Sequence, residues 1–107
     1  MSGIVTVYAT FGDADEAARV GRTLVEERLA ACANILAPCR SIYRWEGRLQ
    51  EDEEVPVLFK VAAEGAERLI ARLAELHSYD VPAAIVWPIG QAHPPYGQWV
   101  RDETTGG

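Results

Sequence analysis

The segment from Ala33 to Lys60 constrains the fold most, because it predicts two long β-strands joined by a tight turn. The first strand runs from Ala33 to Glu46, and alternate side chains point to opposite faces. One of these faces carries Ser41, Tyr43 and Trp45. Gly47 supplies the turn, and the return strand begins at Arg48. A hairpin of this length in so small a chain needs another surface to bury it.

Two prolines are expected to disturb this hairpin. The first strand should be irregular near Ala37-Pro38. A bulge or an unpaired position is expected at Pro56, because proline has no N–H to donate to a ladder. The acidic run Glu51 to Glu54 is polar on both faces, so it should lie in solvent or against another chain.

The length of 107 residues predicts a single domain over residues 1–107. A domain of this size buries about 60–70% of its unfolded surface, which allows one core and no large internal cofactor. The hydrophobic fraction of 49% and the charged fraction of 24% are those of a globular protein rather than a disordered one.

The net charge of −6 argues against nucleic acid or an anionic membrane as the main partner. Lys60 is the only lysine and there is no basic cluster, whereas phosphate binding needs concentrated cations. No segment approaches the roughly 20 apolar residues of a membrane span, and no signal peptide is expected. Cys32 and Cys39 would lie about 23 Å apart on one strand, too far for a disulfide. Reduced thiols fit a cytoplasmic protein.

The remaining elements predict an α+β, ferredoxin-like fold. Asp13 and Glu16 form a capping pair at the start of a helix that should run to Leu29, with Arg28 snorkelling from its apolar face. The other expected elements are a strand Ile4–Phe11, a helix Glu64–Leu76, a buried strand Ala83–Ile89 and a short helix from Pro95. Two interleaved βαβ units of this order give a four-stranded antiparallel sheet with both main helices on one face.

This arrangement leaves the second face of the sheet uncovered. Four side chains are expected there, those of Tyr8, Leu58, Lys60 and Ala62. The edge strand with Tyr43 and Trp45 is uncovered as well. Long exposed edges and open apolar faces favour pairing with another chain, so self-association is predicted on physical grounds.

Several segments together resemble the CutA divalent cation tolerance family, in one register over nearly the whole chain. The most specific is the run Ser41-Ile42-Tyr43-Arg44-Trp45-Glu46-Gly47. The other matching segments are Leu29 to Ile35, the acidic Glu51 to Glu54, Lys60, Leu76 to Tyr79, Val81-Pro82, Tyr96 and Trp99. The resemblance implies a tight homotrimer whose strands extend onto neighbouring subunits, as in the architecture shared with PII-type signalling proteins. It also implies a role in tolerance to copper and other divalent cations.

In bacterial members the resemblance implies a copper site made from a first-strand cysteine and a histidine pair. Here Ala9 stands at the cysteine position and Leu76 replaces one histidine, so only His77 remains. One imidazole does not hold a transition metal tightly, because such sites use three or four ligands. His77 is therefore either a metal ligand supplied in three copies by a trimer or a helix C-cap residue, and the second reading is favoured. Cys39 is the second candidate metal ligand, and Cys32 is expected to be a small buried hydrophobe.

Other residues are candidates for ligand or interface contacts. Lys60 could bind an anion in a cleft between subunits, although an intersubunit ion pair is the favoured reading. The remaining four are Tyr43, Trp45, Glu46 and Trp99. Interfaces favour aromatic side chains, so subunit packing is preferred to a ligand box.

Two functions fit these observations. The first is a non-enzymatic homotrimer for divalent cation tolerance, with no required cofactor and with copper or another divalent metal as a weakly bound ion. The alternative is a PII-like trimeric sensor or protein-interaction module that binds a small ligand between subunits. No nucleophile elbow or glycine-rich phosphate loop is present, so no enzyme is predicted.

Overall fold

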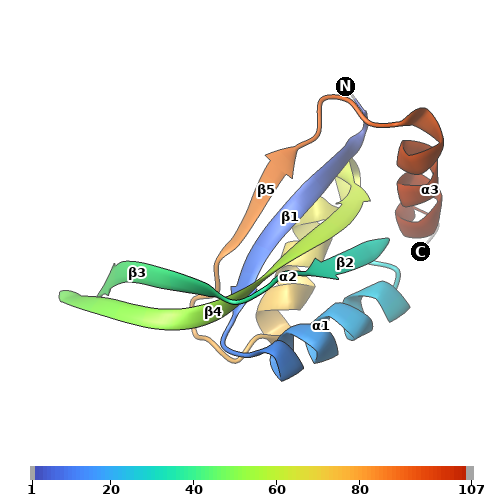
Figure 1. The fold of residues 1–107 in the computed structure, drawn as a ribbon. Coiled ribbons are helices and arrows are strands. Elements are labelled where there is room, and N and C mark those ends of the chain that lie inside the picture. The colour runs from blue at the N-terminus through green and yellow to red at the C-terminus, as the bar shows by residue number, and fades with distance from the viewer. Residues whose placement is uncertain (1, 106–107) are drawn as a thin grey trace.

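The computed structural model describes residues 2–105, in which a five-stranded sheet is combined with three α-helices (Figure 1). The strands are β1 (Ile4–Phe11), β2 (Cys32–Ile35), β3 (Cys39–Trp45), β4 (Arg48–Ala62) and β5 (Ala84–Pro88). The helices are α1 (Ala14–Glu26), the 3-10 turn η1 (Ala63–Gly65), α2 (Ala66–Leu76) and α3 (Pro94–Thr105). None of the helices within residues 2–105 has the length and apolar composition that crossing a membrane requires.

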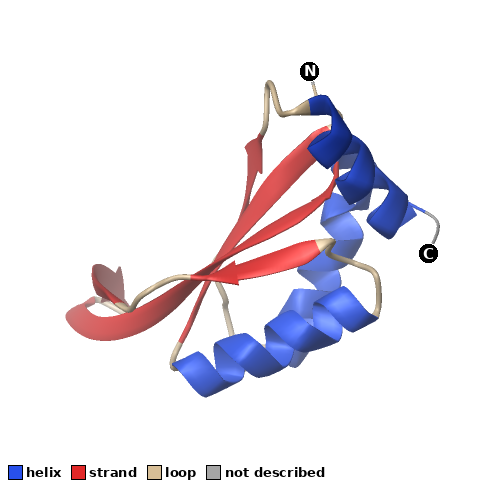
Figure 2. Cartoon of the chain, turned by 45° about the vertical axis from the view of Figure 1, so that its right-hand side comes forward, coloured by secondary structure: helices blue, strands red, loops and turns tan. Residues whose placement is uncertain are grey.

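The sheet has the predicted ferredoxin-like topology. Its order is β2-β4-β1-β5 and every pairing is antiparallel, while β3 pairs with the half of β4 that extends beyond β1. Helices α1 and α2 lie on the same side of the sheet (Figure 2). The predicted fold class is therefore confirmed.

The core lies between the sheet and these two helices. Alternate residues of β1 and β4 point toward the helices, and Val7, Val57 and Phe59 are fully buried there. Leu24 of α1 and Leu69 of α2 belong to the same cluster and are also fully buried. Burying one such side chain contributes about 1.5–3 kcal/mol, so this face is the main source of stability.

The expected first hairpin strand is divided into β2 and β3. Ile35 pairs with Val57 and Cys39 pairs with Glu54, so three residues of one strand face two of the other. This is a β-bulge. The Leu36 amide donates to the Pro56 carbonyl at 2.9 Å, so the missing N–H of Pro56 faces the interrupted side of β4. The irregularity near Ala37-Pro38 is confirmed. Pro56 has no partner in the ladders to β2 and β3, as the alternative of an unpaired position predicted, while the extra residue lies in the strand opposite it.

The second face of the sheet is less open than predicted. Helix α3 covers one end of it, where Ile4, Ala31 and Val100 are buried together. Ala62 is completely buried, so its placement on a bare surface was wrong.

Strand β5 was expected to be buried and is instead an exposed edge strand. Ile85, Val86 and Trp87 keep 49%, 36% and 46% of their surface exposed. The described residues of a single chain therefore cover these three apolar side chains only in part, which is the reason that the sequence pattern misled.

Helix α1 ends three residues earlier than predicted. Asp13 caps its start as expected, accepting the Glu16 amide at 2.7 Å. After Glu26 the chain turns, and Arg28 adopts a left-handed conformation with φ of 62°. Arg28 is thus not a snorkelling helical residue: its guanidinium donates to the carbonyls of Asp102 and Glu103 at the end of α3.

Residues 39–54 of β3 and β4 form an arm that projects from the body (Figure 1). Glu46 and Gly47 at its tip both have positive φ, 51° and 77°, as a tight two-residue hairpin turn requires. The arm makes the chain elongated, 44 × 25 × 23 Å. Its radius of gyration of 14.2 Å exceeds the about 13 Å of a compact chain of this length.

Candidate functional site

A cleft of about 810 Å³, here called the arm cleft, lies where the arm leaves the body. Its lining comes from three regions: β1 and the residue after it, the arm, and the loop between α2 and β5. These contribute Tyr8, Thr10 and Gly12; Ser41, Tyr43, Trp45, Asp52, Glu53 and Glu54; and Tyr79, Asp80, Val81 and Ala83. A volume of this size is typical of small-molecule sites.

The alternation of the arm strands decides which side chains face the arm cleft. Ser41 pairs with Asp52 and Cys39 pairs with Glu54, so their side chains lie on one face together with Tyr43 and Trp45. The grouping of Ser41, Tyr43 and Trp45 on one face was predicted, and the register adds the carboxylates to it.

Two tyrosines hold two of these carboxylates in place. The Tyr43 hydroxyl donates to Asp52 Oδ2 at 2.5 Å, and the Tyr79 hydroxyl donates to Glu54 Oε2 at 3.0 Å. Tyr79 thereby connects the loop after α2 to the arm.

The carboxylates keep the neighbouring phenols protonated. Burial and the hydrogen bond to Glu54 raise the pKa of Tyr79 to about 12. The hydrogen bond to Asp52 raises the pKa of Tyr43 above its ordinary value of 10.0. Burial raises the pKa of Tyr8, and Cys39 and Glu54 raise it further. The tyrosines therefore act as hydrogen-bond donors at neutral pH.

His77, the first candidate metal ligand, is a buried structural residue next to the arm cleft. It caps α2, and its Nε2 lies 2.7 Å from the Thr10 carbonyl oxygen. Its Nδ1 accepts the Tyr79 amide proton at 3.1 Å, so the bonds fit the neutral ring with its proton on Nε2. The ring also stacks on Phe11 with centroids 4.6 Å apart. Both nitrogens are thus engaged, and neither offers a free lone pair to a metal.

The two cysteines are separated and carry free thiols. Cys39, the second candidate metal ligand, is half-buried at the base of the arm, with Sγ 3.8 Å from the Ser41 hydroxyl. Cys32 is half-buried rather than buried, with Sγ 3.6 Å from the Tyr96 hydroxyl. Among residues 2–105 no group of three His, Cys, Asp or Glu side chains could hold a metal ion.

Lys60 lies on the second face of the sheet, in register with Thr6 and Cys32. Its Nζ donates to Asn34 Oδ1 at 2.6 Å. The arm cleft does not include it, so the structure separates Lys60 from the aromatic candidates.

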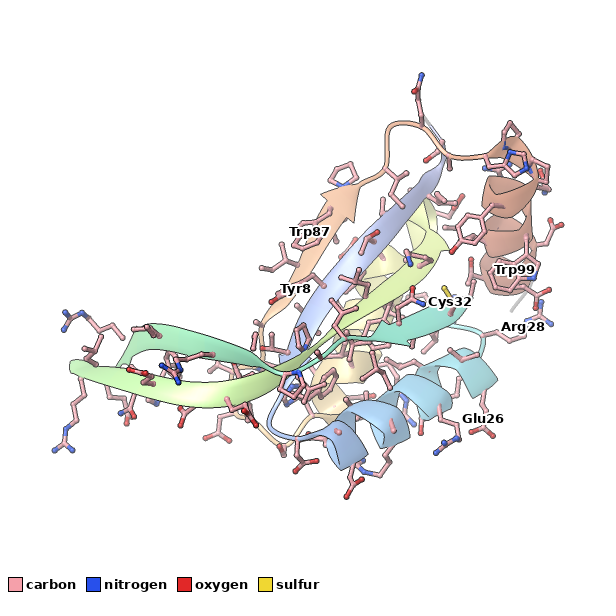
Figure 3. The ribbon with its side chains drawn as sticks, in the orientation of Figure 1. Tyr8, Glu26, Arg28, Cys32, Trp87 and Trp99 are labelled. Carbon is pink, nitrogen blue, oxygen red and sulfur yellow. The ribbon has the colours of Figure 1, made fainter. Side chains whose placement is uncertain are left out.

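The other candidates are dispersed over the molecule. Tyr43 and Trp45 line the arm cleft, whereas Glu46 lies in the turn at the tip of the arm. Trp99 lies on α3, at the end of the molecule away from the arm (Figure 3). There it packs against Tyr96 with centroids 5.7 Å apart.

Two contributions were missed from the sequence. Tyr8 stacks on Trp87 with centroids 4.8 Å apart, which places an aromatic pair on the second face of the sheet (Figure 3). Glu16 is buried and accepts both the amide and the hydroxyl of Ser78, at 2.8 and 2.9 Å. The capping pattern identified Glu16 but gave no sign of this long-range role.

The sequence model of the CutA1 divalent ion tolerance protein family matches residues 5–103. This chain belongs to the CutA1 family. The divalent-cation tolerance protein CutA of Pyrococcus horikoshii is 43% identical over 101 residues, covering 94% of this chain and 98% of that protein. The CutA of Thermus thermophilus is 41% identical over 98 residues, covering 92% of this chain and 95% of that protein.

Solved CutA structures share the fold. The crystal structure of CutA from Xylella fastidiosa superposes with a TM-score of 0.92 at 34% identity, covering 95% of this chain and 98% of that one. The family resemblance and the fold predicted for this CutA1 chain are thereby confirmed.

The described residues of one CutA1 chain do not fit a copper centre. A transition metal requires three or four ligands. His77 is occupied on both nitrogens, and Ala9 stands where the resemblance implies a cysteine.

Proposed function

We propose that this CutA1 chain acts in divalent-cation tolerance as a non-enzymatic homotrimer. The observation that carries the proposal is the set of apolar side chains left exposed on the arm and on β5. On the arm these are Ile42 (62% exposed), Tyr43 (40%), Trp45 (44%) and Leu49 (72%). Exposed apolar strands with unpaired edges are sites of chain pairing.

The positions of these edges favour a closed ring. In the described residues β5 pairs only with β1, and β3 pairs only with β4. The arm lies at one end of the molecule, so an arm of one copy laid against the β5 edge of the next makes a head-to-tail contact. Repeated contacts of this kind form rings when the rotation closes. Three copies would also bring together metal-ligating side chains that lie apart within one chain.

The lining of the arm cleft supports a non-enzymatic role. It contains tyrosines and carboxylates but no histidine, cysteine or lysine among the described lining residues. The hydroxyls of Tyr43 and Tyr79 donate to Asp52 and Glu54, and the raised pKa of both phenols opposes their activation as nucleophiles.

Light scattering of the purified protein tests the assembly. Three copies of an 11.7 kDa chain give a mass of about 35 kDa. Ile85→Glu places a charge on the exposed β5 edge and should lower this mass toward that of one chain. Val25→Glu is the matched control, because Val25 is 36% exposed on α1, on the other side of the sheet. A wild-type protein that stays monomeric, or two variants that dissociate equally, would contradict the proposed assembly.

Calorimetric titration with Cu²⁺, on protein whose thiols have been reduced and from which the reductant has been removed, tests the metal part separately. If ligands come from several copies, the wild type should bind copper saturably, whereas the dissociated Ile85→Glu variant should not. A trimer with no saturable binding would leave the assembly intact and refute direct copper binding.

A further inference from the structure

Helix α3 is anchored to the body by little apolar surface. Among its described side chains only Val100 is both apolar and fully buried, and it packs with Ile4 and Ala31 in a small cluster apart from the main core. Helices α1 and α2 each bury several apolar side chains in that core. Because hydrophobic stabilisation is roughly proportional to the apolar area removed from water, α3 is held much less firmly than the other two helices.

Arg28 fastens the last turn of α3 to the end of α1 (Figure 3). Its Nε donates to the Glu103 carbonyl and its Nη2 to the Asp102 carbonyl, each at 3.1 Å. The last carbonyls of a helix have no partner within the helix, and the helix dipole favours a positive charge beside them. The guanidinium thus supplies two donors at the place where α3 lacks them.

Two further hydrogen bonds join α3 to backbone groups beside the sheet. The Thr104 hydroxyl accepts the Ala62 amide proton at 3.1 Å, and the Arg101 guanidinium donates to the Ser2 carbonyl at 2.6 Å. The net contribution of such a bond is modest, because water replaces the lost partner when the groups separate. The attachment of α3 therefore depends on a few polar contacts that water can replace.

Arg28 adopts a backbone conformation that favours glycine. It directly follows the C-cap of α1 with φ of 62°, and the Leu29 amide donates to the Leu24 carbonyl at 3.0 Å, as in a Schellman helix end. A side chain in this left-handed region carries a conformational cost that glycine avoids. The bonds from Arg28 to α3 offset this cost, so the arginine joins the two helix ends.

We propose that α3 is a latch, a helix that opens as one unit, and that the Arg28 bonds set how often it opens. Opening breaks the bonds of Arg28 and Thr104 and uncovers Ile4 and Ala31. The main core stays closed, because no described side chain of α3 belongs to it. Elements with few buried apolar contacts open locally while the rest of a protein stays folded. The latch is separate from the arm, so the proposal goes beyond the assembly and the tolerance role.

Native-state amide hydrogen exchange tests the opening on the purified protein in the assembly that it adopts. The amides of residues 98–104 should share one opening equilibrium. They should exchange at least about a hundredfold faster than the core amides of Leu24 and Leu69, after correction for intrinsic rates. A shared value shows that the helix opens as a unit, whereas fraying gives values graded along the helix. Graded values, or α3 amides as protected as the core amides, would overturn the proposal.

The substitution Arg28→Gly tests the latch contact. Glycine suits the left-handed conformation, so α1 keeps its end while the two bonds to α3 are lost. The opening equilibrium of α3 should rise at least about fivefold. The core amides should accelerate less, because the relief of backbone strain stabilises the folded body in the closed and open states alike.

Two further variants serve as comparisons. Arg28→Lys keeps the positive charge but not the forked donors, so it should open α3 more often than the wild type and less often than Arg28→Gly. Arg22→Ala removes the same charge from the exposed side of α1 and should leave the α3 equilibrium within about twofold of the wild type. Exchange of α3 that is equal in Arg28→Gly and Arg22→Ala would refute the latch.

Discussion

The substitution His77→Ala separates the structural reading of this histidine from the metal-ligand reading. The His77 side chain is fully buried, with side-chain exposure of 0%. It connects the end of β1, the cap of α2 and the loop that carries Tyr79. Alanine would remove all of these contacts without altering any exposed charge.

The expected loss follows from the contacts. Removing the ring leaves the Thr10 carbonyl and the Tyr79 amide without their partner, at about 1–3 kcal/mol for each group that stays buried. The stacking contact with Phe11 is lost as well, and aromatic pairs contribute about 0.5–1.5 kcal/mol. Water can enter and compensate in part. We expect the free energy of unfolding to fall by about 2–4 kcal/mol.

Urea unfolding at matched protein concentration measures this change, because the stability of an oligomer depends on concentration. His93→Ala is the control, since His93 lies exposed in the loop before α3. It should change the free energy of unfolding by less than about 0.5 kcal/mol. The reasoning is refuted if His77→Ala is as stable as the control but has lost copper binding, because His77 would then be a ligand.

Two further predictions concern Tyr79 and Arg28. The pKa of Tyr79 is raised from 10.0 to about 12, so its contribution to stability is complete below pH 10 and is lost as the pH rises toward 12. Ultraviolet titration should show less tyrosinate at pH 10 in the folded protein than in urea. The substitution Glu54→Gln should lower the pKa of Tyr79. A Tyr79 pKa that is the same in this variant and in the wild type would contradict the role of Glu54. Arg28→Ala should destabilise by about 1–2 kcal/mol in urea unfolding, because the last carbonyls of α3 lose two hydrogen bonds. Arg22→Ala on the exposed side of α1 is its control, and equal effects of the two would contradict that account.

Periodicity predicted the parts of the fold that depend on one element at a time. The apolar spacing in α2 and the alternation in β1 and β4 show which face of each element is buried in the core. These faces were predicted correctly. The tertiary role of Arg28 could not be predicted in this way. Its carbonyl partners lie more than seventy positions away on α3, and a left-handed arginine leaves no signature in a helical pattern.

Strand β5 shows a different limit. Continuous apolar residues predict burial but do not say which chain provides the cover. Ile85 and Trp87 are exposed in one chain because they pair with Tyr8 and Thr6 and so lie on the face of the sheet that α1 and α2 leave uncovered. The apolar run of β5 thus marks a surface that a single copy leaves partly uncovered.

The arm cleft could be predicted only in part. The face with Tyr43 and Trp45 followed from alternation within one strand. Tyr79 and Asp80 reach the same place from the loop after α2, and that proximity depends on the tertiary fold. The sequence allowed His77 to be interpreted as a helix cap. Its two side-chain hydrogen bonds, to Thr10 and Tyr79, could not be predicted because the Thr10 contact depends on the tertiary fold.

Amide hydrogen exchange on β5 tests the central claim most directly, which is that copies of this chain complete one another's sheet edges. Antiparallel strands pair through alternate residues, so part of the β5 amides point away from β1. The account predicts that these outward amides are protected to a degree comparable with those of β1, and that Ile85→Glu removes their protection. Outward amides that exchange as fast as those of an unpaired strand in the wild-type protein would contradict it.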